Sequence, residues 1–395
     1  MKNGLFQIFT KAYSGIRREM WLLAVAMLIN RSGSMVLLFM SVYLTKEKHF
    51  SIEQAGIILS LFGVGSLVGA FVGGKLVDRF GFYPILIWSL VLSGCMIIAL
   101  SFVANFYLIG TLTFLVTSTG DAFRPANSAS ISAYSDAEHY AQSIALNRLA
   151  MNIGFTIGPM LGGFLAHYSY TFLFWADGIT CILAACFIYL FLPYRTLDKK
   201  TTGAKTENLS PYLDKQYLFF LLLTCIYAMS FFQLLTTLPL YYKNVYLLSE
   251  RNIGWLMALN GIGVAVIEMF LIYYIKNRWH HFQLIGWGVL LLIAAFVSLV
   301  LTKSIWILVL NIVLLTFSEM LAMPFMSTHS LQRAQNRNTG DYMALYSMSW
   351  SIALILAPLL GSQIIAWQGY QALWLSIAGC GVLTWFGFKV LAKQE

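Results

Sequence analysis

An acid, a base and a proline lie within five residues of one another in one of the most apolar parts of the chain. The stretch TSTGDAFRPANSAS covers residues 117–130 and contains Asp121, Arg124 and Pro125. A charged side chain deep in a membrane is costly unless it faces water or a partner, so such residues are candidates for function. The chemistry that fits is proton binding by the carboxylate, controlled by a neighbouring base.

Arg31 is predicted to stand at the same depth as Asp121. Each lies about eleven residues from the cytoplasmic end of its apolar segment, at roughly 1.5 Å per residue. We therefore predict that Arg31 and Asp121 face each other, while Arg124 can also pair with Asp121 along one helix. A static ion pair that only holds the helices together is the alternative.

Glu319 differs from Asp121 because no basic residue lies at its depth in the second half of the sequence. A buried carboxylate without a counter-ion tends to take up a proton. Glu319 is therefore the first candidate for a proton site and Asp121 the second. Glu268 lies nearer the cytoplasmic end of its segment, where a snorkelling or packing role is as plausible as a functional one.

The composition shows where these residues must lie. Of the 395 residues, 59% are hydrophobic and 10% are charged, whereas a soluble domain carries about 25% charged residues. The mean hydropathy is +0.74. A membrane crossing needs roughly 20 apolar residues, and such segments occupy residues 20–44, 53–77, 84–104, 107–134, 143–167, 171–193, 216–242, 251–275, 282–302, 305–328, 341–367 and 369–391. The sequence therefore predicts an all-α membrane protein with twelve transmembrane helices.

The net charge of +9 follows this topology. Most Lys and Arg residues fall in segments that are cytoplasmic when both termini are inside, which is the positive-inside pattern. The first nineteen residues contain no short apolar core with a cleavage site, so we expect no cleaved signal peptide. We expect a multi-pass protein of a bacterial cytoplasmic membrane, with membrane lipid around it and no nucleic-acid partner.

A repeat divides the chain into two six-helix halves. The segment FSIEQAGIILSLFGVG at 50–65 matches LSERNIGWLMALNGIG at 248–263, with an offset of 198 residues (248 − 50 = 198). The same offset places Asp121 on Glu319 (319 − 121 = 198). The predicted parts are an N-terminal half at 1–193, a polar cytoplasmic linker at 194–215 and a C-terminal half at 216–395. Repeated halves with polar groups at mid-membrane are typical of secondary transporters.

Two motifs carry a resemblance to a known family. GGKLVDRFG at 73–81 resembles the loop 2-3 signature of the major facilitator superfamily, and NRLAMNIGFTIGPMLGGFL at 147–165 resembles its fifth-helix motif. The resemblance covers essentially the whole chain and implies the major facilitator fold. Within the superfamily, the chain looks most like the bacterial twelve-helix drug:proton antiporters.

The resemblance implies functions for both motifs. The loop motif, in which Gly74 and Gly81 are expected to allow a tight turn, would close the cytoplasmic side through Asp78 and Arg79. Phe82 and Tyr83 stand where the family continues its charge relay, so that part of the motif is missing. The fifth-helix motif accompanies antiport in the family, although its small residues can also serve packing alone. It comprises Gly154, Gly158, Pro159, Gly162 and Gly163.

Polar and aromatic residues near mid-depth are candidates to line a substrate cavity, in helices that line the cavity in the family. They are Asn30, Arg31, Asn147, Arg148, Asn152, Gln233, Asn260, Glu268, Tyr346 and Trp350. For each of them, simple packing is the competing interpretation.

Other chemistry finds little support in the sequence. Gly69 to Lys75 reads G-x-x-x-x-G-K, but Leu76 follows where a phosphate-binding loop needs Ser or Thr, so we interpret it as a packed glycine face. The five cysteines lack zinc-ligand spacing. We therefore expect no catalytic cluster, no metal and no cofactor, and a membrane-embedded enzyme is disfavoured.

The sequence thus favours a proton-coupled secondary transporter that moves a small organic molecule by alternating access, with efflux by antiport as the leading direction. We expect a functional monomer. The alternative is a proton symporter that imports a zwitterionic solute such as a short peptide or a metallophore-like compound. Asn30 precedes Arg31 where peptide transporters have an acidic pair, which weakens this alternative.

Overall fold

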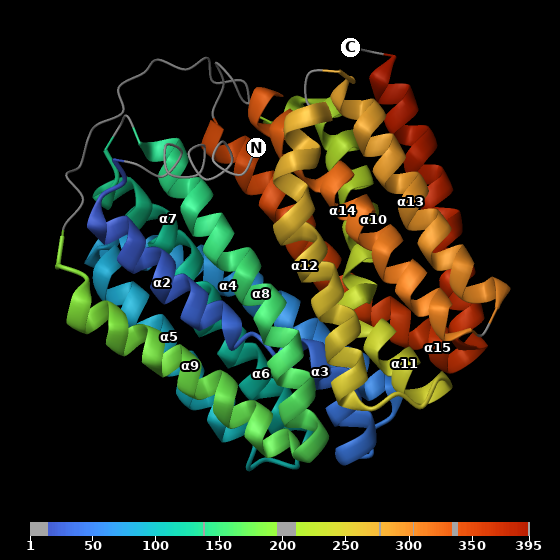
Figure 1. The fold of residues 1–395 in the computed structure, drawn as a ribbon, viewed down its shortest axis with the longest axis horizontal. Helices are drawn as coiled ribbons and strands as arrows, with labels where there is room; N and C mark the ends of the chain where they lie inside the picture. Colours follow the sequence, from blue (N-terminus) through green and yellow to red (C-terminus); the bar gives the residue numbers. More distant parts are fainter. Residues whose placement is uncertain are drawn as a thin grey trace, which may run out of the picture. The chain divides into compact units, whose positions relative to one another are not determined.

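The structure is a computed structural model that describes residues 15–136, 139–195, 211–275, 278–302, 304–333 and 339–393. These residues form helices and connecting turns (Figure 1). In the first part of the chain the helices are α2 (Arg18–Ser32), α3 (Val36–Val42), η1 (Tyr43–Glu47), α4 (Ile52–Phe80), α5 (Phe82–Leu100), α6 (Phe106–Asp121), α7 (Phe123–Tyr134), α8 (Tyr140–Tyr168) and α9 (Tyr170–Phe191). In the second part they are η2 (Pro211–Leu213), α10 (Lys215–Thr236), α11 (Leu238–Val245), α12 (Glu250–Ile275), α13 (His281–Leu301), α14 (Ile305–Arg333) and α15 (Thr339–Ala392).

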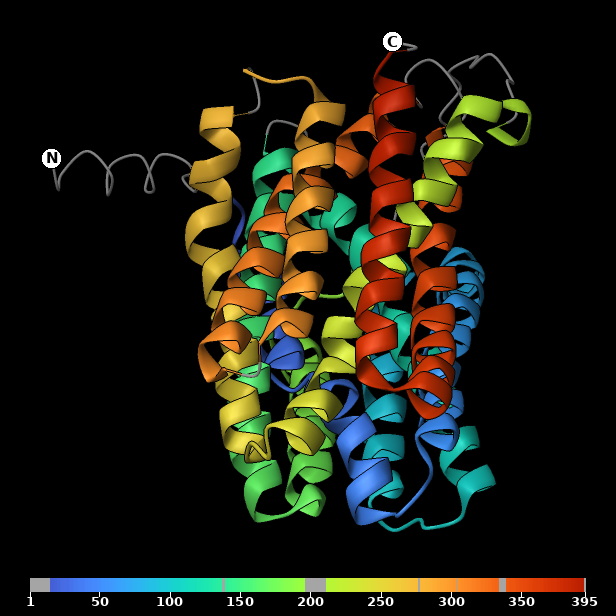
Figure 2. The same ribbon diagram turned by 90° about the vertical axis from the view of Figure 1, so that its right-hand side faces the viewer.

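The predicted twelve-helix membrane fold is confirmed. Nine segments of the described residues are long and apolar enough to cross a membrane. One of them, α15, contains Gly369 with φ 81° and ψ 177°, so two helices meet there, and Figure 2 shows α15 folding back on itself. The pair α6 and α7 supplies the fourth predicted crossing, and α12 supplies the eighth.

The chain packs into two compact units. The first comprises Met1–Val36 with Gly65–Lys200, and the second comprises Leu37–Val64 with Thr201–Glu395. The chain therefore leaves the first unit after Val36, the first residue of α3, and re-enters it within α4. Residues 196–210 of the predicted linker lie outside the described residues, and the predicted boundaries at 193 and 216 stay a prediction.

The repeat is visible in the helix starts and in the packing. The helices α4 and α12 begin 198 residues apart (250 − 52 = 198), and α6 and α14 begin 199 apart (305 − 106 = 199). Within the first unit α2 packs on α8 and α5 packs on α9, while in the second unit α10 and α13 pack on α15. The apolar core of the first unit includes Leu23, Phe82 and Phe123.

Each unit also contains an ion pair at the corresponding place, but with opposite polarity. In the first unit, Arg17 before α2 donates from Nε to Asp136 after α7 at 2.7 Å. In the second unit, Asp214 before α10 accepts from Nε of Arg333 at the end of α14 at 2.9 Å. Both pairs span 119 residues. Each pair joins the start of the first crossing of a predicted half to the end of its fourth crossing.

The two pairs differ in their surroundings. The side chains of Arg17 and Asp136 are 41% and 40% exposed. Those of Arg333 and Asp214 are 26% and 10% exposed, and the guanidinium binds both carboxylate oxygens. Asp214 also caps α10 by accepting from the Tyr217 N–H at 3.1 Å. The second pair is therefore part of a network, and its acid is fixed in place by the helix that it caps.

We predict that reversing the polarity is tolerated in the first pair and not in the second. The double variant Arg17→Asp with Asp136→Arg should melt within a few degrees of the wild type, because an exposed pair contributes about 0.2–1 kcal/mol. Asp214→Arg with Arg333→Asp should melt clearly lower, because arginine cannot cap α10 and its charge opposes the helix dipole. Thermal unfolding of the purified protein in detergent measures both, and equal melting temperatures would contradict the assignment.

Candidate functional site

The polar residues of the first unit gather around the end of α2. Arg31 lies in the last turn of α2, with its guanidinium carbon 5.4 Å from the centre of the Phe155 ring on α8. Its Nε is buried without a hydrogen-bond partner among the described residues. Asp121 and Asp177 both lie within electrostatic range of this guanidinium. Arg31 therefore lies near the two acids and also near the like charge of Arg124, and it forms an ion pair with neither acid.

The predicted pairing of Asp121 with Arg124 along the chain is found, with 2.9 Å between Arg124 Nε and Asp121 Oδ1. Arg31 lies within electrostatic range of Asp121, as expected for residues that face each other, but no ion pair joins the two. The helix is interrupted at Ala122, between α6 and α7. Pro125 has no N–H to offer the Asp121 carbonyl four residues earlier, which explains an interruption here. Asp121 therefore pairs with Arg124, which lies three residues away in the sequence.

The fifth-helix motif packs against the end of α2. A Cβ at Gly154 would lie 2.5 Å from the Arg31 Cβ, and a Cβ at Gly158 would lie 3.3 Å from the Arg31 carbonyl oxygen. Gly162 and Gly163 are buried, and Pro159 lies inside α8. The first two glycines are thus required for close packing against the backbone that carries Arg31.

The other polar candidates of the first unit do not form one cluster. Asn30 donates from Nδ2 to the Cys181 sulfur at 3.6 Å. Asn147 is buried, and its Oδ1 has no hydrogen-bond partner among the described residues. Arg148 is exposed and Asn152 is half-buried.

The glycine face on α4 is confirmed, whereas the expected turn at Gly74 is wrong. A Cβ at Gly69 would overlap the Ser118 backbone, and a Cβ at Gly73 would lie 2.5 Å from the Ala122 Cα. Gly74 lies within the continuous helix α4, so only Gly81, with φ 83°, makes the turn. Asp78 and Arg79 of the loop motif are exposed at the end of α4, and their gating function stays a prediction.

In the second unit, Glu319 is bound by a neutral donor. Asn260 Nδ2 on α12 lies 3.1 Å from Glu319 Oε2 and 3.0 Å from Thr316 Oγ1 on α14. Next to Glu319, Ser318 is hydrogen bonded to the hydroxyl of Tyr227 on α10 at 3.0 Å. Among the described residues of this unit, no cationic side chain pairs with Glu319. This agrees with the prediction that Glu319 lacks a counter-ion.

The remaining candidates of the second unit lie on α10, α12 and α15. Gln233 is buried, donates from Nε2 to the Ala357 carbonyl at 3.0 Å and accepts from the Thr237 hydroxyl at 2.7 Å. The Trp350 ring packs edge-on against Tyr346, with 6.3 Å between the ring centres. Glu268 is half-buried on α12, within electrostatic range of Glu319. Gln233 therefore links α10 to α15 through a hydrogen bond. Tyr346, Trp350 and the two glutamates are of the residue types that a substrate-binding surface needs.

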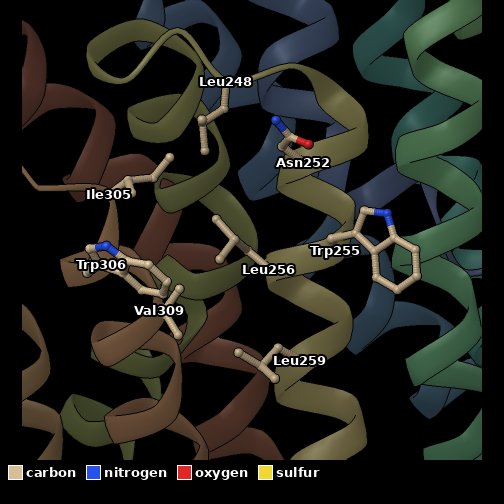
Figure 3. Close-up of a pocket in the computed structure, with 8 residues that line it drawn as sticks. All are labelled: Leu248, Asn252, Trp255, Leu256, Leu259, Ile305, Trp306 and Val309. Carbon is tan, nitrogen blue, oxygen red and sulfur yellow. The ribbon is translucent and has the colours of Figure 1, made fainter.

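A groove of about 380 Å³ lies between the first turns of α12 and α14. Figure 3 shows its lining residues, with Leu256 between the two helices and Trp255 pointing away from the α14 side chains. Asn252 is its one polar lining residue. None of the predicted site residues lines this groove, so it does not correspond to the predicted substrate cavity.

Comparison with known proteins decides the family. The sequence profile of the Major Facilitator Superfamily matches residues 21–358. The chain belongs to the major facilitator superfamily. This membership confirms the resemblance of the two motifs and makes the chain a transporter rather than an enzyme.

Proteins that are similar to this chain carry names that describe several different transport activities. The chain is 23% identical to the "Na(+), Li(+), K(+)/H(+) antiporter" of Planococcus maritimus, over 91% of this chain and 92% of the relative. It is 22% identical to "Quinolone resistance protein NorA" of Staphylococcus aureus, over 87% of this chain and 90% of the relative. Among solved structures, a POT family transporter in complex with 5-aminolevulinic acid has a TM-score of 0.80 at 13% identity, covering 97% of both chains. The structural likeness shows the major facilitator fold.

The sequence did not predict the contact that Asp177 makes. This carboxylate is buried in α9 and accepts two backbone N–H bonds from the end of the first-helix break, at Met35 and Val36. Its position within the apolar segment at 171–193 was the available signal, because membrane carboxylates need donors. Its partners could not be read from the sequence, since they are backbone groups of a distant helix.

We predict that the Asp121–Arg124 pair is energetically coupled more strongly than Asp121 and Arg31. A double-mutant cycle with Asp121→Ala and Arg124→Ala should give a coupling of about 0.3–1 kcal/mol, because Arg124 is 53% exposed and solvent weakens the pair. The matched cycle with Arg31→Ala should give a smaller value. Unfolding free energies measure both coupling energies. A larger coupling of Asp121 with Arg31 than with Arg124 would contradict the prediction.

Proposed function

We propose that this transporter exports a small organic molecule in exchange for protons, by alternating access in the cytoplasmic membrane of a bacterium. The observation that carries the proposal is the Glu319 carboxylate, which lies within a membrane-spanning helix and is held by the neutral Asn260 amide. A carboxylate in this setting can bind or release a proton without breaking an ion pair. Both termini are cytoplasmic in this proposal, and the protein works as a monomer.

The names of the relatives support exchange and export. One relative is named for antiport of cations against protons, and another for quinolone resistance. Each of them matches about nine-tenths of this chain, so the likeness includes both repeats. The identities are 23% and 22%, so the substrate of this chain remains part of the proposal.

The contacts of Asn260 suggest how protonation changes the second unit. The Asn260 amide has two N–H groups and donates to both the Glu319 carboxylate and the Thr316 hydroxyl. An ionised carboxylate is the stronger acceptor of the two. Protonation of Glu319 weakens this bond between α12 and α14, whereas the bond to Thr316 remains. The two protonation states therefore favour different contacts, which coupling requires.

The other charged residues have secondary roles in the proposal. Asp121, which forms an ion pair with Arg124, is the second proton-binding candidate. Arg31 supplies positive charge in the first unit. The residues predicted to line the substrate cavity, and the gating motif on α4, keep their predicted roles.

Import of a zwitterion with protons is the second candidate. The specific observation in its favour is that Arg31 and Arg124 belong to the first unit, whereas Glu319 belongs to the second. A zwitterionic solute needs a partner of each sign, and both signs occur within the membrane helices of this chain. The solved POT family structures share the fold and add no residue-level support at 13% identity.

The two candidates are separated by one transport assay. The purified protein in liposomes is given a pH gradient of either direction and a panel of cationic, zwitterionic and anionic organic solutes, with Na⁺ and K⁺ as further candidates. Antiport moves the solute against the proton flow, and symport moves it with the flow. Transport that ignores the gradient in both directions would contradict proton coupling altogether.

We predict that Glu319→Gln abolishes concentrative transport driven by a pH gradient and leaves counterflow exchange of the same solute intact. Glutamine mimics the protonated carboxyl and cannot release a proton. Thr316→Val is the matched control, because it removes the other oxygen that binds Asn260 and keeps the carboxylate; it should stay coupled. If Glu319→Gln protein still concentrates solute from the proton gradient alone, coupling lies elsewhere and Asp121 is tested next.

A further inference from the structure

The first membrane helix of the chain is broken, and a side chain from another helix holds the break. The helix α2 ends at Ser32, and α3 begins at Val36. The backbone N–H groups of Met35 and Val36 donate to Asp177 Oδ2 at 3.1 and 3.0 Å. Asp177 is 5% exposed, so its carboxylate takes the place of water for the Val36 N–H, whereas the Met35 N–H also donates to the Gly33 carbonyl at 2.6 Å.

The break is enclosed on two sides. On the α9 side, a Cβ at Gly33 would overlap the Thr180 hydroxyl, and that hydroxyl donates to the Asp177 carbonyl at 2.8 Å. On the α8 side, a Cβ at Gly158 would lie 3.4 Å from the Ser34 carbonyl oxygen. The backbone at the break therefore has little space in which to shift while Asp177 remains bonded.

The position of Arg31 depends on this break. Arg31 precedes Met35 by four residues and lies in the last turn of α2, so any change in the break moves the end of the helix that carries it. Its guanidinium lies over the Phe155 ring and within electrostatic range of Asp177. Gly154 packs against its Cβ at close range.

We propose that Asp177 is a positioning residue for transport: its carboxylate holds the break in the first helix and thereby fixes Arg31. This inference rests on the proposed function, because it assigns Arg31 to the transport site. Asp177 acts through geometry, by presenting one oxygen atom to two backbone donors. It contacts neither the substrate nor the transported proton in this proposal.

Two substitutions of Asp177 separate the charge of the carboxylate from the position of its oxygen atoms. Asparagine at position 177 keeps an oxygen at the same distance from the backbone and removes the charge. Glutamate keeps the charge and moves the oxygen outward by one methylene. A positioning residue should tolerate Asp177→Asn better than Asp177→Glu, whereas a proton carrier should show the reverse order.

The experiment compares these variants in the full-length protein reconstituted in liposomes. Counterflow exchange, which needs no proton gradient, is measured alongside transport driven by a pH gradient. We expect Asp177→Asn to retain most exchange and an unchanged pH profile. We expect Asp177→Glu to lose about ten- to hundred-fold in turnover, as small misplacements of transport groups do.

A double variant tests whether Asp177 acts through Arg31. If it does, Asp177→Glu with Arg31→Ala should exchange solute no more slowly than Arg31→Ala alone. Asn105→Ala is the matched control, because Asn105 also accepts two backbone N–H bonds, from Tyr107 and Leu108, but at the exposed start of α6. It should leave exchange unchanged.

Three results would overturn the inference. Loss of exchange in Asp177→Asn with retention in Asp177→Glu would make the charge, not the geometry, the requirement. Additive losses in the double variant would leave Asp177 with a general structural role. Wild-type exchange in both single variants would show that transport does not depend on the contact. Failure of proton coupling in the wild-type protein would instead overturn the proposed function, because the exchange assay does not require it.

Discussion

A carboxylate inside a membrane protein must exchange its water for other donors, and the three described above do so in different ways. Asp177 accepts two backbone N–H bonds, Asp121 pairs with an arginine, and Glu319 accepts from a side-chain amide. Backbone donors stay in place while the helices hold, and a cation favours the ionised form. A side-chain amide is less fixed in position than a backbone N–H, and it stabilises the ionised form less than a cation does. A carboxylate that is held by a neutral side-chain amide can therefore change its protonation state without breaking an ion pair.

This difference also relates the two halves of the chain to each other. Asp121 and Glu319 occupy equivalent places in the repeat, yet only the first has a base one helical turn away. The ion pairs at the helix ends show a similar relation, since Arg17–Asp136 and Asp214–Arg333 join equivalent positions with opposite polarity. The repeat thus preserves where helices are joined, while the residue types at the joints differ. Equivalent positions can therefore serve different functions.

Much of the fold followed from the sequence, because hydropathy and charge bias act along single helices. The crossings, the glycine face around Gly69 and the lack of a cationic partner for Glu319 among the described residues of its unit were all predicted in this way. Depth along a helix can be counted from its cytoplasmic end. The direction in which a side chain points around the helix depends on packing with other helices, which the count does not include.

The incorrect and missing predictions share this cause. Arg31 and Asp121 were placed at one depth, but depth does not show whether two side chains form an ion pair, and Asp121 pairs with Arg124 three residues away. The contact of Asp177 was missed because its partners, the N–H groups of Met35 and Val36, exist only where the first helix is broken. The local signal for a break is the cluster Ser32-Gly33-Ser34, but the residue that caps it lies about 140 positions away and cannot be identified locally.

The second unit contains one further contact that the proposed mechanism would have to separate. The outer part of α4 packs on α15 through glycines: a Cβ at Gly56 would lie 2.8 Å from the Pro358 carbonyl oxygen, and one at Gly63 would lie 2.7 Å from the Ile355 nitrogen. This contact joins helices of the two predicted halves. Glycines have no side chains to interlock, so little apolar area is lost when such helices part. Close packing without interlocking side chains allows a contact to be firm when closed and still reversible, as alternating access requires.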